Sequence, residues 1–246
     1  MEKNFKLTIE YDGSDFHGWQ RQNRDRTIQG EIENALQAMT KQKINLVGSG
    51  RTDAGVHAFG QVANFKCETR LDSETFLNGL NSLLPDSIVI CTCELVNEDF
   101  HARYAARSKI YRYRILNRRL PTAIRRQYCW HIRRTLDLDA MRRAAAHVIG
   151  THDFKAFEGT GSPRSDTIRQ VFDAGLYREA EDYLVFEIKA EGFLRFMVRN
   201  IIGTLVEVGL GKITPEDFKA ILLSKDRSNA GATAPPNGLF LVRVEY

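Results

Sequence analysis

The sequence lacks a long apolar run. No hydrophobic segment approaches the roughly 18 residues that a membrane-spanning helix needs. The first residues, MEKNFKLTIEYDG, alternate polar and apolar side chains as a strand does, unlike the continuous apolar core of a signal peptide. With 43% hydrophobic and 27% charged residues, the composition is that of an ordinary globular protein. We therefore expect a protein of the cytoplasm.

Cysteine is scarce and is not arranged for metal binding. The four cysteines form no CxxC pair, and the six histidines do not supply the ligand spacing of a zinc site. Cys91 and Cys93 stand in the strand-like segment SIVICTCELV, where alternate residues share one face. We expect buried thiols and no metal site.

Other signatures of common enzyme classes are also missing. The Gly-Ser-Gly at 48–50 is not followed by the Lys-Ser or Lys-Thr of a phosphate-binding loop. Residues 151–154, THDF, contain a His-Asp pair without the further ligands of a metal hydrolase, and we expect a loop there, after the helix that ends at Gly150. Nucleotide-dependent and metal-dependent hydrolysis are therefore not indicated.

Acidic residues are absent from one stretch of the chain. Residues 1–100 hold ten Lys and Arg against 15 Asp and Glu, whereas residues 101–134 hold eleven basic residues and no acidic one. Ten of these eleven are Arg, which binds phosphate through two parallel hydrogen bonds and stacks on bases. A solvated basic face is the alternative, but so many uncompensated charges favour a polyanion as partner, most simply a nucleic acid.

Hydrophobic periodicity predicts two successive units of similar plan. In the first half we expect strands at 5–13, 61–68 and 87–96 and helices at 27–40 and 73–85, the first helix capped by Thr27. In the second half we expect strands at 109–116, 170–179, 182–190 and 239–246 and helices at 138–150, 193–209 and 215–224.

This order predicts an α+β fold of two similar domains. Each would be a mostly antiparallel sheet with helices packed on one face. We place the N-terminal domain at 1–105, including a loop at 48–58, and the C-terminal domain at 106–246. If the two sheets meet, a basic cleft forms around the junction, and concave sites favour such places.

The loop at 48–58, GSGRTDAGVHA, is a poor helix and a broken strand. Its three glycines allow sharp bends and close approach by another molecule, so that Arg51 and Asp53 would be displayed. A solvated turn is the alternative. Because Arg51 stands two residues away, the Asp53 carboxylate would favour its ionised form, which suits a nucleophile better than a general acid. No second carboxylate accompanies Asp53, so a two-carboxylate glycosidase is less favoured.

The segment YRYRI alternates aromatic and basic side chains at strand spacing. Tyr111 and Tyr113 would share one face, and Arg112 and Arg114 the other. A core face and a solvent face explain this pattern. In a nucleic-acid enzyme, a tyrosine near the cleft would instead stack on an extruded base.

Three segments carry a close resemblance to a known family. GSGRTDAGVHA, FHARYAARSKIYRYRI and GFLRFMVRNIIGTLVEVG together resemble the tRNA pseudouridine synthase I (TruA) family. LTIEYDGSDFHGWQRQ, TIQGEIENAL and AGATAPPNGLFLVRVEY are similar to that family in the same order, so that the resemblance spans nearly the whole chain.

The resemblance implies an activity and a set of site residues. Members convert uridine to pseudouridine at positions 38, 39 and 40 of the tRNA anticodon stem-loop, without a metal or cofactor. By this similarity Asp53 is the catalytic nucleophile, attacking either the base or the sugar. Arg51 would fill the space of the flipped base, Tyr111 would pack on the target uracil, and Arg199 would pair with Asp53.

The resemblance also implies RNA contacts and a homodimer. The tRNA-contacting stretch is Phe100, His101, Ala102, Arg103 and Tyr104, and a structural role is the alternative for Phe100. Arg107, Arg125 and Arg126 would add phosphate contacts, and residues 158–170 match a further tRNA-contacting loop. One tRNA would contact both subunits of a symmetric pair.

Two other functions compete with this hypothesis. A non-catalytic RNA-binding domain would use the same arginine-rich surface and would leave Asp53 without a chemical role. A nucleoside hydrolase would use the Asp53 carboxylate but would release free uracil, whereas isomerisation conserves the mass of the RNA.

Overall fold

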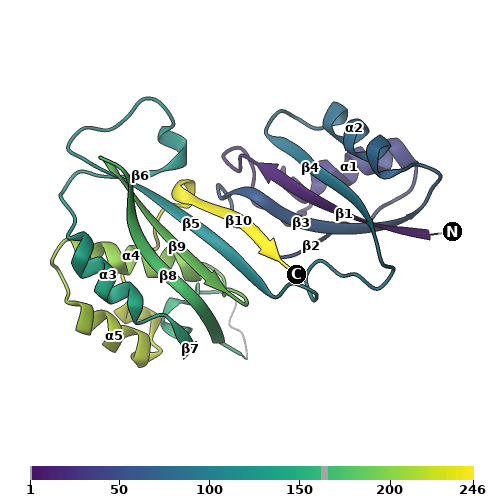
Figure 1. Ribbon diagram of the computed structural model, residues 1–246. Coiled ribbons are helices and arrows are strands. Elements are labelled where there is room, and N and C mark those ends of the chain that lie inside the picture. Colours follow the sequence, from purple (N-terminus) through teal and green to yellow (C-terminus); the bar gives the residue numbers. More distant parts are fainter. Residues whose placement is uncertain (1, 162–165) are drawn as a thin grey trace. The chain divides into compact units, whose positions relative to one another are not determined.

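The computed structural model describes residues 2–161 and 166–246, and the chain divides into two compact units (Figure 1). Unit 1 is Met1–Arg107 with Phe240–Tyr246, and unit 2 is Ser108–Leu239. In the described ranges the fold is mixed α and β, with five α-helices and mostly antiparallel strand pairs, which confirms the predicted class. The domain boundary predicted at 105/106 and the basic cleft stay predictions.

Unit 1 is built on a sheet in the strand order β4, β1, β3, β10. The β1 strand pairs antiparallel with both of its neighbours. The β10 strand pairs parallel with the start of β3, and β2 pairs antiparallel with the middle of β3. The strands are β1 (Glu2–Tyr11), β2 (Val47–Gly48), β3 (His57–Glu68), β4 (Ile88–Val96) and β10 (Leu239–Glu245). Helices α1 (Ile28–Thr40) and α2 (Ser73–Leu83) contact each other and lie on one side of this sheet (Figure 1).

Aromatic side chains join the helices of unit 1 to its sheet. Phe5 and Phe65 are cross-strand partners with ring centroids 5.4 Å apart, and Phe76 of α2 packs on both of them. All three side chains are buried. Their burial fixes the register of β1 against β3, because a slip by one residue would turn the phenylalanines to the other face.

Unit 2 has an antiparallel sheet in the order β5, β9, β8, β7, with β6 parallel to β5. The strands are β5 (Ser108–Asn117), β6 (Trp130–Ile132), β7 (Gly150–Asp153), β8 (Ile168–Ala180) and β9 (Tyr183–Ala190). Helices α3 (Leu138–Ala146), α4 (Met197–Gly209) and α5 (Pro215–Ser224) contact one another, so they form one layer (Figure 1). Of the predicted tRNA-contacting loop at 158–170, residues 162–165 lie outside the described ranges.

Several local predictions are wrong. The helix predicted at 138–150 ends at Ala146, four residues early. The loop predicted for THDF is instead mostly strand, because residues 150–153 form β7 by pairing with Ile168–Val171 of β8. The predicted burial of all four thiols fails at Cys91, which is exposed, and Cys93 is only half-buried. Both belong to β4, which lies at the edge of the sheet of unit 1 and shifts register opposite Thr8 and Ile9.

Candidate active site

The loop at 48–58 joins strand β2 to strand β3. The main-chain N–H of Val56 donates to the carbonyl of Asp53 at 3.1 Å and closes a turn, in which Gly55 has a φ of 76°. Arg51 is exposed, Thr52 is buried and Asp53 is half-buried. The loop therefore presents two charged side chains from a backbone that is anchored between them.

The anchor is a segment that lies far from the loop in the sequence. The N–H of Trp19 donates to the carbonyl of Thr52 at 3.1 Å. Gly18 has a φ of 90°, and a β-carbon there would lie 2.7 Å from the same carbonyl, while a β-carbon on Gly48 would lie 2.6 Å from the Trp19 indole. Two of the glycines therefore permit a close approach of segment 13–19 to the loop.

A buried hydrogen bond fixes the side chain at the centre of the loop. The hydroxyls of Tyr11 and Thr52 lie 2.7 Å apart, and both side chains are buried. Burial raises the pKa of Tyr11, so its phenol stays neutral. The bond to Tyr11 thus holds Thr52, the residue that precedes Asp53, against strand β1.

Removal of this bond should destabilise unit 1. Tyr11→Phe leaves the Thr52 hydroxyl buried without its partner, and we expect the free energy of unfolding to fall by about 1–3 kcal/mol in urea denaturation. Tyr11→Phe combined with Thr52→Val removes both hydroxyls and should recover most of that loss. The single variant Thr52→Val completes the cycle. If the double variant loses as much stability as the two single variants added together, the two hydroxyls are not coupled.

A second set of contacts joins the end of the loop to strands β1 and β10. The Nδ1 atom of buried His57 accepts from the N–H of Gly13 at 3.1 Å and lies 3.0 Å from Oδ1 of Asp12. The His57 ring stacks on Phe240 with centroids 4.8 Å apart. A β-carbon on Gly13 would lie 2.0 Å from the carbonyl oxygen of Val56, so only glycine fits there.

The predicted tRNA-contacting segment 100–104 divides into anchoring and outward residues. Ala102 is fully buried, donates its N–H to Asn64 and accepts from the Tyr246 hydroxyl. The Phe100 ring packs on Tyr246 with centroids 5.1 Å apart. Tyr104 is 76% exposed, and the Arg103 guanidinium lies 5.7 Å from its ring centre. The outward side of this segment is therefore formed by its arginine and tyrosine, with the half-buried His101 beside them.

Part of the positive charge of the basic run at 101–134 is neutralised by acidic residues from other parts of the chain. Three of its arginines are paired with acids of strands β8 and β9 and of the turn between them: Arg112 with Glu187, Arg114 with Glu179, and Arg118 with Asp182. The exposed arginines are the remaining ones, namely Arg103, Arg107, Arg119, Arg125, Arg126, Arg133 and Arg134. The exposed arginine charge of the run is therefore carried by these seven side chains.

The tyrosines of β5 lie on the core face, as their spacing predicts. Tyr113 is fully buried, and its hydroxyl donates to the carbonyl of Pro235 at 2.7 Å. Tyr111 is 8% exposed, and its ring meets Phe193 edge to face with centroids 5.0 Å apart. Within unit 2, the contact with Phe193 thus helps to orient the ring of Tyr111.

Arg199 stands in the first turn of α4. Its Nε donates to the carbonyl of Ala234 at 2.7 Å, and its guanidinium lies 4.9 Å from the ring centre of Phe196. Phe196 caps the helix in the left-handed conformation with a φ of 61°, which is rare for a bulky residue. The side chain of Arg199 is therefore fixed on two sides.

Sequence reasoning assigned no site role to the groups that support these residues. These supporting residues each lie more than 30 positions from the residue that they contact, and neither periodicity nor composition pairs them. They are Tyr11, Trp19 and Ala234. The one feature of the sequence that includes these supporting residues is the family resemblance: Tyr11 and Trp19 lie in the segment YDGSDFHGW, and Ala234 lies in AGATAPP.

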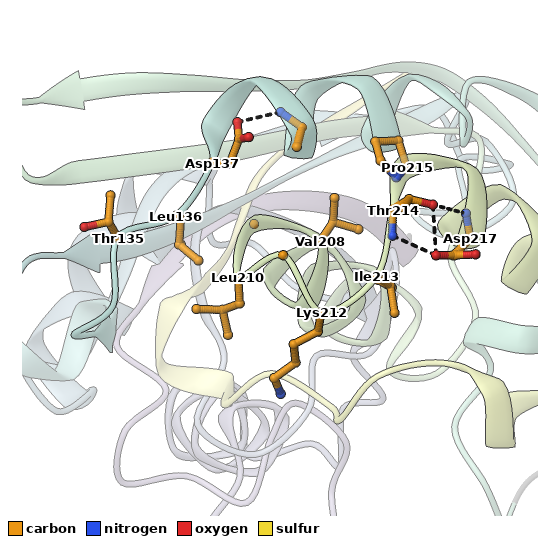
Figure 2. A pocket seen from close by; sticks show the side chains of 13 residues that line it. Thr135, Leu136, Asp137, Val208, Leu210, Lys212, Ile213, Thr214, Pro215 and Asp217 are labelled. Carbon is orange, nitrogen blue, oxygen red and sulfur yellow. Dashed lines mark hydrogen bonds between the residues drawn. The ribbon is translucent and has the colours of Figure 1, made fainter.

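A separate pocket of about 570 Å³ in unit 2 does not involve the predicted residues (Figure 2). It lies between the first turns of α3 and α5 and the end of α4. Three of its polar side chains already serve as helix caps, since Asp137 accepts from Ala140 and Thr214 exchanges hydrogen bonds with Asp217. Elsewhere in the described ranges, no group of three or more His, Cys, Asp or Glu side chains is arranged to hold a metal ion.

Comparison with known proteins identifies the class. The family model described as tRNA pseudouridine synthase matches residues 7–105 and 144–246, which include Asp53, Arg51 and Arg199. The chain therefore belongs to the tRNA pseudouridine synthase family, and it is an isomerase that acts on tRNA.

Individual relatives are similar in sequence to this chain over nearly its full length. The chain is 48% identical to tRNA pseudouridine synthase A of Thermoanaerobacter sp. (strain X514) over 99% of this chain and 100% of the relative. It is 47% identical to the protein of the same name in Acetivibrio thermocellus, with the same shares covered. It is 46% identical to that of Moorella thermoacetica over 98% of each chain.

Two further findings concern structure. A chain from the crystal structure of a Cbf5-Nop10-Gar1 complex matches 96% of this chain and 57% of its own length, with 12% identity and a TM-score of 0.38, a likeness too low to support an argument. Within the described ranges, no helix combines the length and the apolarity that crossing a membrane requires.

Proposed function

We propose that the protein isomerises uridine to pseudouridine at positions 38, 39 and 40 of the tRNA anticodon stem-loop, with Asp53 as nucleophile. The observation that carries the proposal is the loop at 48–58, which holds a half-buried carboxylate on a backbone fixed at Thr52 and Val56. Family membership supplies tRNA as the substrate. We place this activity in the cytoplasm.

The reaction needs one carboxylate and no oxidant or reductant. The bond between N1 of uracil and C1′ of the ribose breaks, the base turns, and C5 bonds to C1′. The proton on C5 is then lost, and N1 gains one, so the atoms balance. The Asp53 carboxylate forms a transient covalent bond with the uridine and splits one difficult step into easier ones.

Arg51 serves to present the base. A uridine stacked in a stem is out of reach, and turning it outward costs a few kcal/mol. Arg51 is exposed and stands two residues before Asp53 on a loop bent by glycine, so its long side chain can occupy the space that the base leaves. Arg51→Ala should therefore impair base presentation more than tRNA binding.

Two residues of unit 2 complete the proposed site. Tyr111 packs its ring on the target uracil, and Arg199 pairs with the ionised Asp53 carboxylate and orients it. Arg199 lies within the range that the family model matches, and its Nε is held by the carbonyl of Ala234. Tyr111 lies outside that range, and its support is the resemblance of the segment YRYRI and the edge-to-face contact of its ring with Phe193. An adjacent guanidinium favours the charged form of a carboxylate, which is the nucleophilic form.

The proposed RNA surface consists of exposed cations and one exposed aromatic ring. It comprises His101, Arg103, Tyr104, Arg107, Arg125 and Arg126, and Phe100 and Ala102 hold the first part of it in place. We propose further that the protein acts as a homodimer with one tRNA contacting both subunits.

Neutralising the exposed arginines should weaken binding and flatten its salt dependence. For Arg125→Gln with Arg126→Gln we expect a lower affinity for tRNA, and a salt slope smaller by roughly one for each phosphate that is no longer neutralised. Fluorescence anisotropy over a range of salt concentrations measures both. The control is Arg143→Gln with Lys219→Gln, which removes the same charge from exposed positions outside the basic run. An unchanged slope in the first variant would place the RNA path elsewhere.

The function itself is tested by one incubation. An unmodified tRNA transcript is incubated with the purified protein alone, and pseudouridine is mapped at single-nucleotide resolution. We expect pseudouridine at positions 38–40 and no free uracil. Release of uracil would indicate the nucleoside hydrolase, and binding without any change in the RNA would indicate the non-catalytic domain.

A further inference from the structure

The segment that follows α5 lies directly on the buried helix α4. A β-carbon on Gly203 would lie 1.7 Å from the carbonyl oxygen of Ala232, and one on Gly231 would lie 3.0 Å from the α-carbon of Thr204. The N–H of Gly231 also donates to the Thr204 hydroxyl at 3.0 Å. The backbone at 231–234 is therefore packed against the helix with no side chain between them.

A buried polar cluster ties this segment to the residue next to Arg199. The amide oxygen of fully buried Asn200 accepts from the Thr233 hydroxyl at 2.6 Å and from the Arg227 guanidinium at 3.2 Å. The amide nitrogen of Asn200 donates to the carbonyl of Phe157 at 2.8 Å. Arg227 also donates to Thr233 and to the carbonyl of Ala230, so each member of the cluster has at least two partners.

This cluster fixes the carbonyl group that holds Arg199. Ala234 follows Thr233 directly, donates its N–H to the carbonyl of Arg199 at 3.1 Å and accepts from the Arg199 Nε at 2.7 Å. The carbonyl of the next residue, Pro235, accepts from the Tyr113 hydroxyl. Ala234 is thus held between two fixed neighbours.

A second contact of the Arg199 guanidinium comes from a residue with a strained backbone. The Phe196 ring lies beneath it, and a β-carbon on Gly159 would lie 2.6 Å from that ring. The N–H of Gly159 donates to the carbonyl of Arg195 at 2.8 Å, next to the left-handed Phe196. Unfavourable backbone conformations persist where the surrounding structure holds them, commonly at functional sites.

We propose that Thr233, acting through the Asn200 cluster and the Ala234 carbonyl, is a positioning residue for the Arg199 guanidinium. The proposal rests on the proposed function, in which Arg199 orients the nucleophile. An arginine side chain has many rotamers. Contacts that hold the Arg199 side chain in one rotamer before substrate binds remove the entropic cost of ordering that side chain during the reaction. Thr233 contacts neither substrate nor reacting atoms in this mechanism.

The test compares Thr233→Val with Thr233→Ser. Valine keeps the shape and loses the hydroxyl, whereas serine keeps the hydroxyl. We expect Thr233→Val to lower kcat for pseudouridine formation about tenfold with KM for tRNA within twofold of the unaltered protein, and Thr233→Ser to restore most of kcat. Thermal melting of each variant shows whether it is folded at the assay temperature. Phe196→Leu removes the ring that contacts the Arg199 guanidinium, and it should lower kcat in the same way.

A double-variant cycle separates positioning from general stability. In an Arg199→Lys background the hydrogen bond from Nε is absent, so adding Thr233→Val should change kcat by less than twofold. A tenfold further loss in that background, or an unchanged kcat in both Thr233→Val and Phe196→Leu, would overturn the proposal. The unaltered protein is assayed beside them: absence of pseudouridine there would refute the proposed function instead.

Discussion

Asp53→Asn should bind tRNA and form no pseudouridine. The substitution keeps the size of the side chain and removes the nucleophilic carboxylate, so we expect kcat to fall on the order of 10⁴-fold or more, as for loss of other catalytic nucleophiles. The proposed RNA surface consists of other residues, so we expect the dissociation constant for tRNA to change by less than about threefold. Product is measured by mapping pseudouridine in the transcript, and binding by anisotropy.

The matched control for this variant is Asp15→Asn. Asp15 is an exposed carboxylate of unit 1, in the same segment that supports the loop, and it forms no hydrogen bond or ion pair in the described part of the chain. We expect the control to retain full activity and binding. Appreciable product from Asp53→Asn would refute the assigned nucleophile, whereas loss in both variants would point to the net charge of the unit.

Gly203→Ala should be among the most destabilising single-methyl additions in the protein. The added β-carbon would lie 1.7 Å from the carbonyl oxygen of Ala232, which is backbone and belongs to a segment held by the Asn200 cluster. Neither partner can move without breaking buried hydrogen bonds. Overpacking of this kind costs about 3 kcal/mol, which lowers the melting temperature by roughly 6–12 °C.

Gly175→Ala is the control for the added methyl group. Gly175 lies in strand β8, and a β-carbon there would have no atom within 4 Å. We expect its melting temperature to stay within about 2 °C of the unaltered protein, since replacing glycine also reduces the freedom of the unfolded chain. Equal melting temperatures for Gly203→Ala and Gly175→Ala would show that segment 231–234 can move away from α4 at little energetic cost.

The helix ends that could be predicted are those marked by a local capping residue. Helix α1 begins after Thr27, whose hydroxyl accepts from Gly30 as expected, and α5 matches the predicted range 215–224, with Thr214 and Asp217 forming a reciprocal cap. Helix α4 begins four residues later than predicted, at Met197. The periodicity there includes Phe193 and Leu194, but Phe196 takes a left-handed conformation that no sequence pattern marks.

The short strands could not be predicted because their pairing decides them. Strands β6 and β7 have only three and four residues and exist through their partners β5 and β8. The exposure of Cys91 likewise depends on the position of β4 at the edge of the sheet of unit 1. Such outcomes follow from contacts between distant segments, which a single window of sequence does not contain.

For the candidate site, the sequence suggests the proposed reacting groups but not the residues that support them. Glycine spacing and an isolated acid pointed to Asp53, and the family resemblance supplied Arg51, Tyr111 and Arg199. The pairing of Arg112, Arg114 and Arg118 could not be anticipated, because their acidic partners stand 64 to 75 residues further along the chain. Counting charges along the sequence therefore overstated the free positive charge.

The pairing of β10 with β3 constrains how the chain folds during synthesis. Phe240 and Leu241 pair with His57 and Ala58, at the point where the loop at 48–58 ends, and Tyr246 bonds to Ala102. Unit 1 thus needs residues that leave the ribosome only after all of unit 2 has been translated. A nascent chain stalled anywhere before Phe240 would carry an unfinished first unit with an open β3 edge, so this protein should complete its amino-terminal half last.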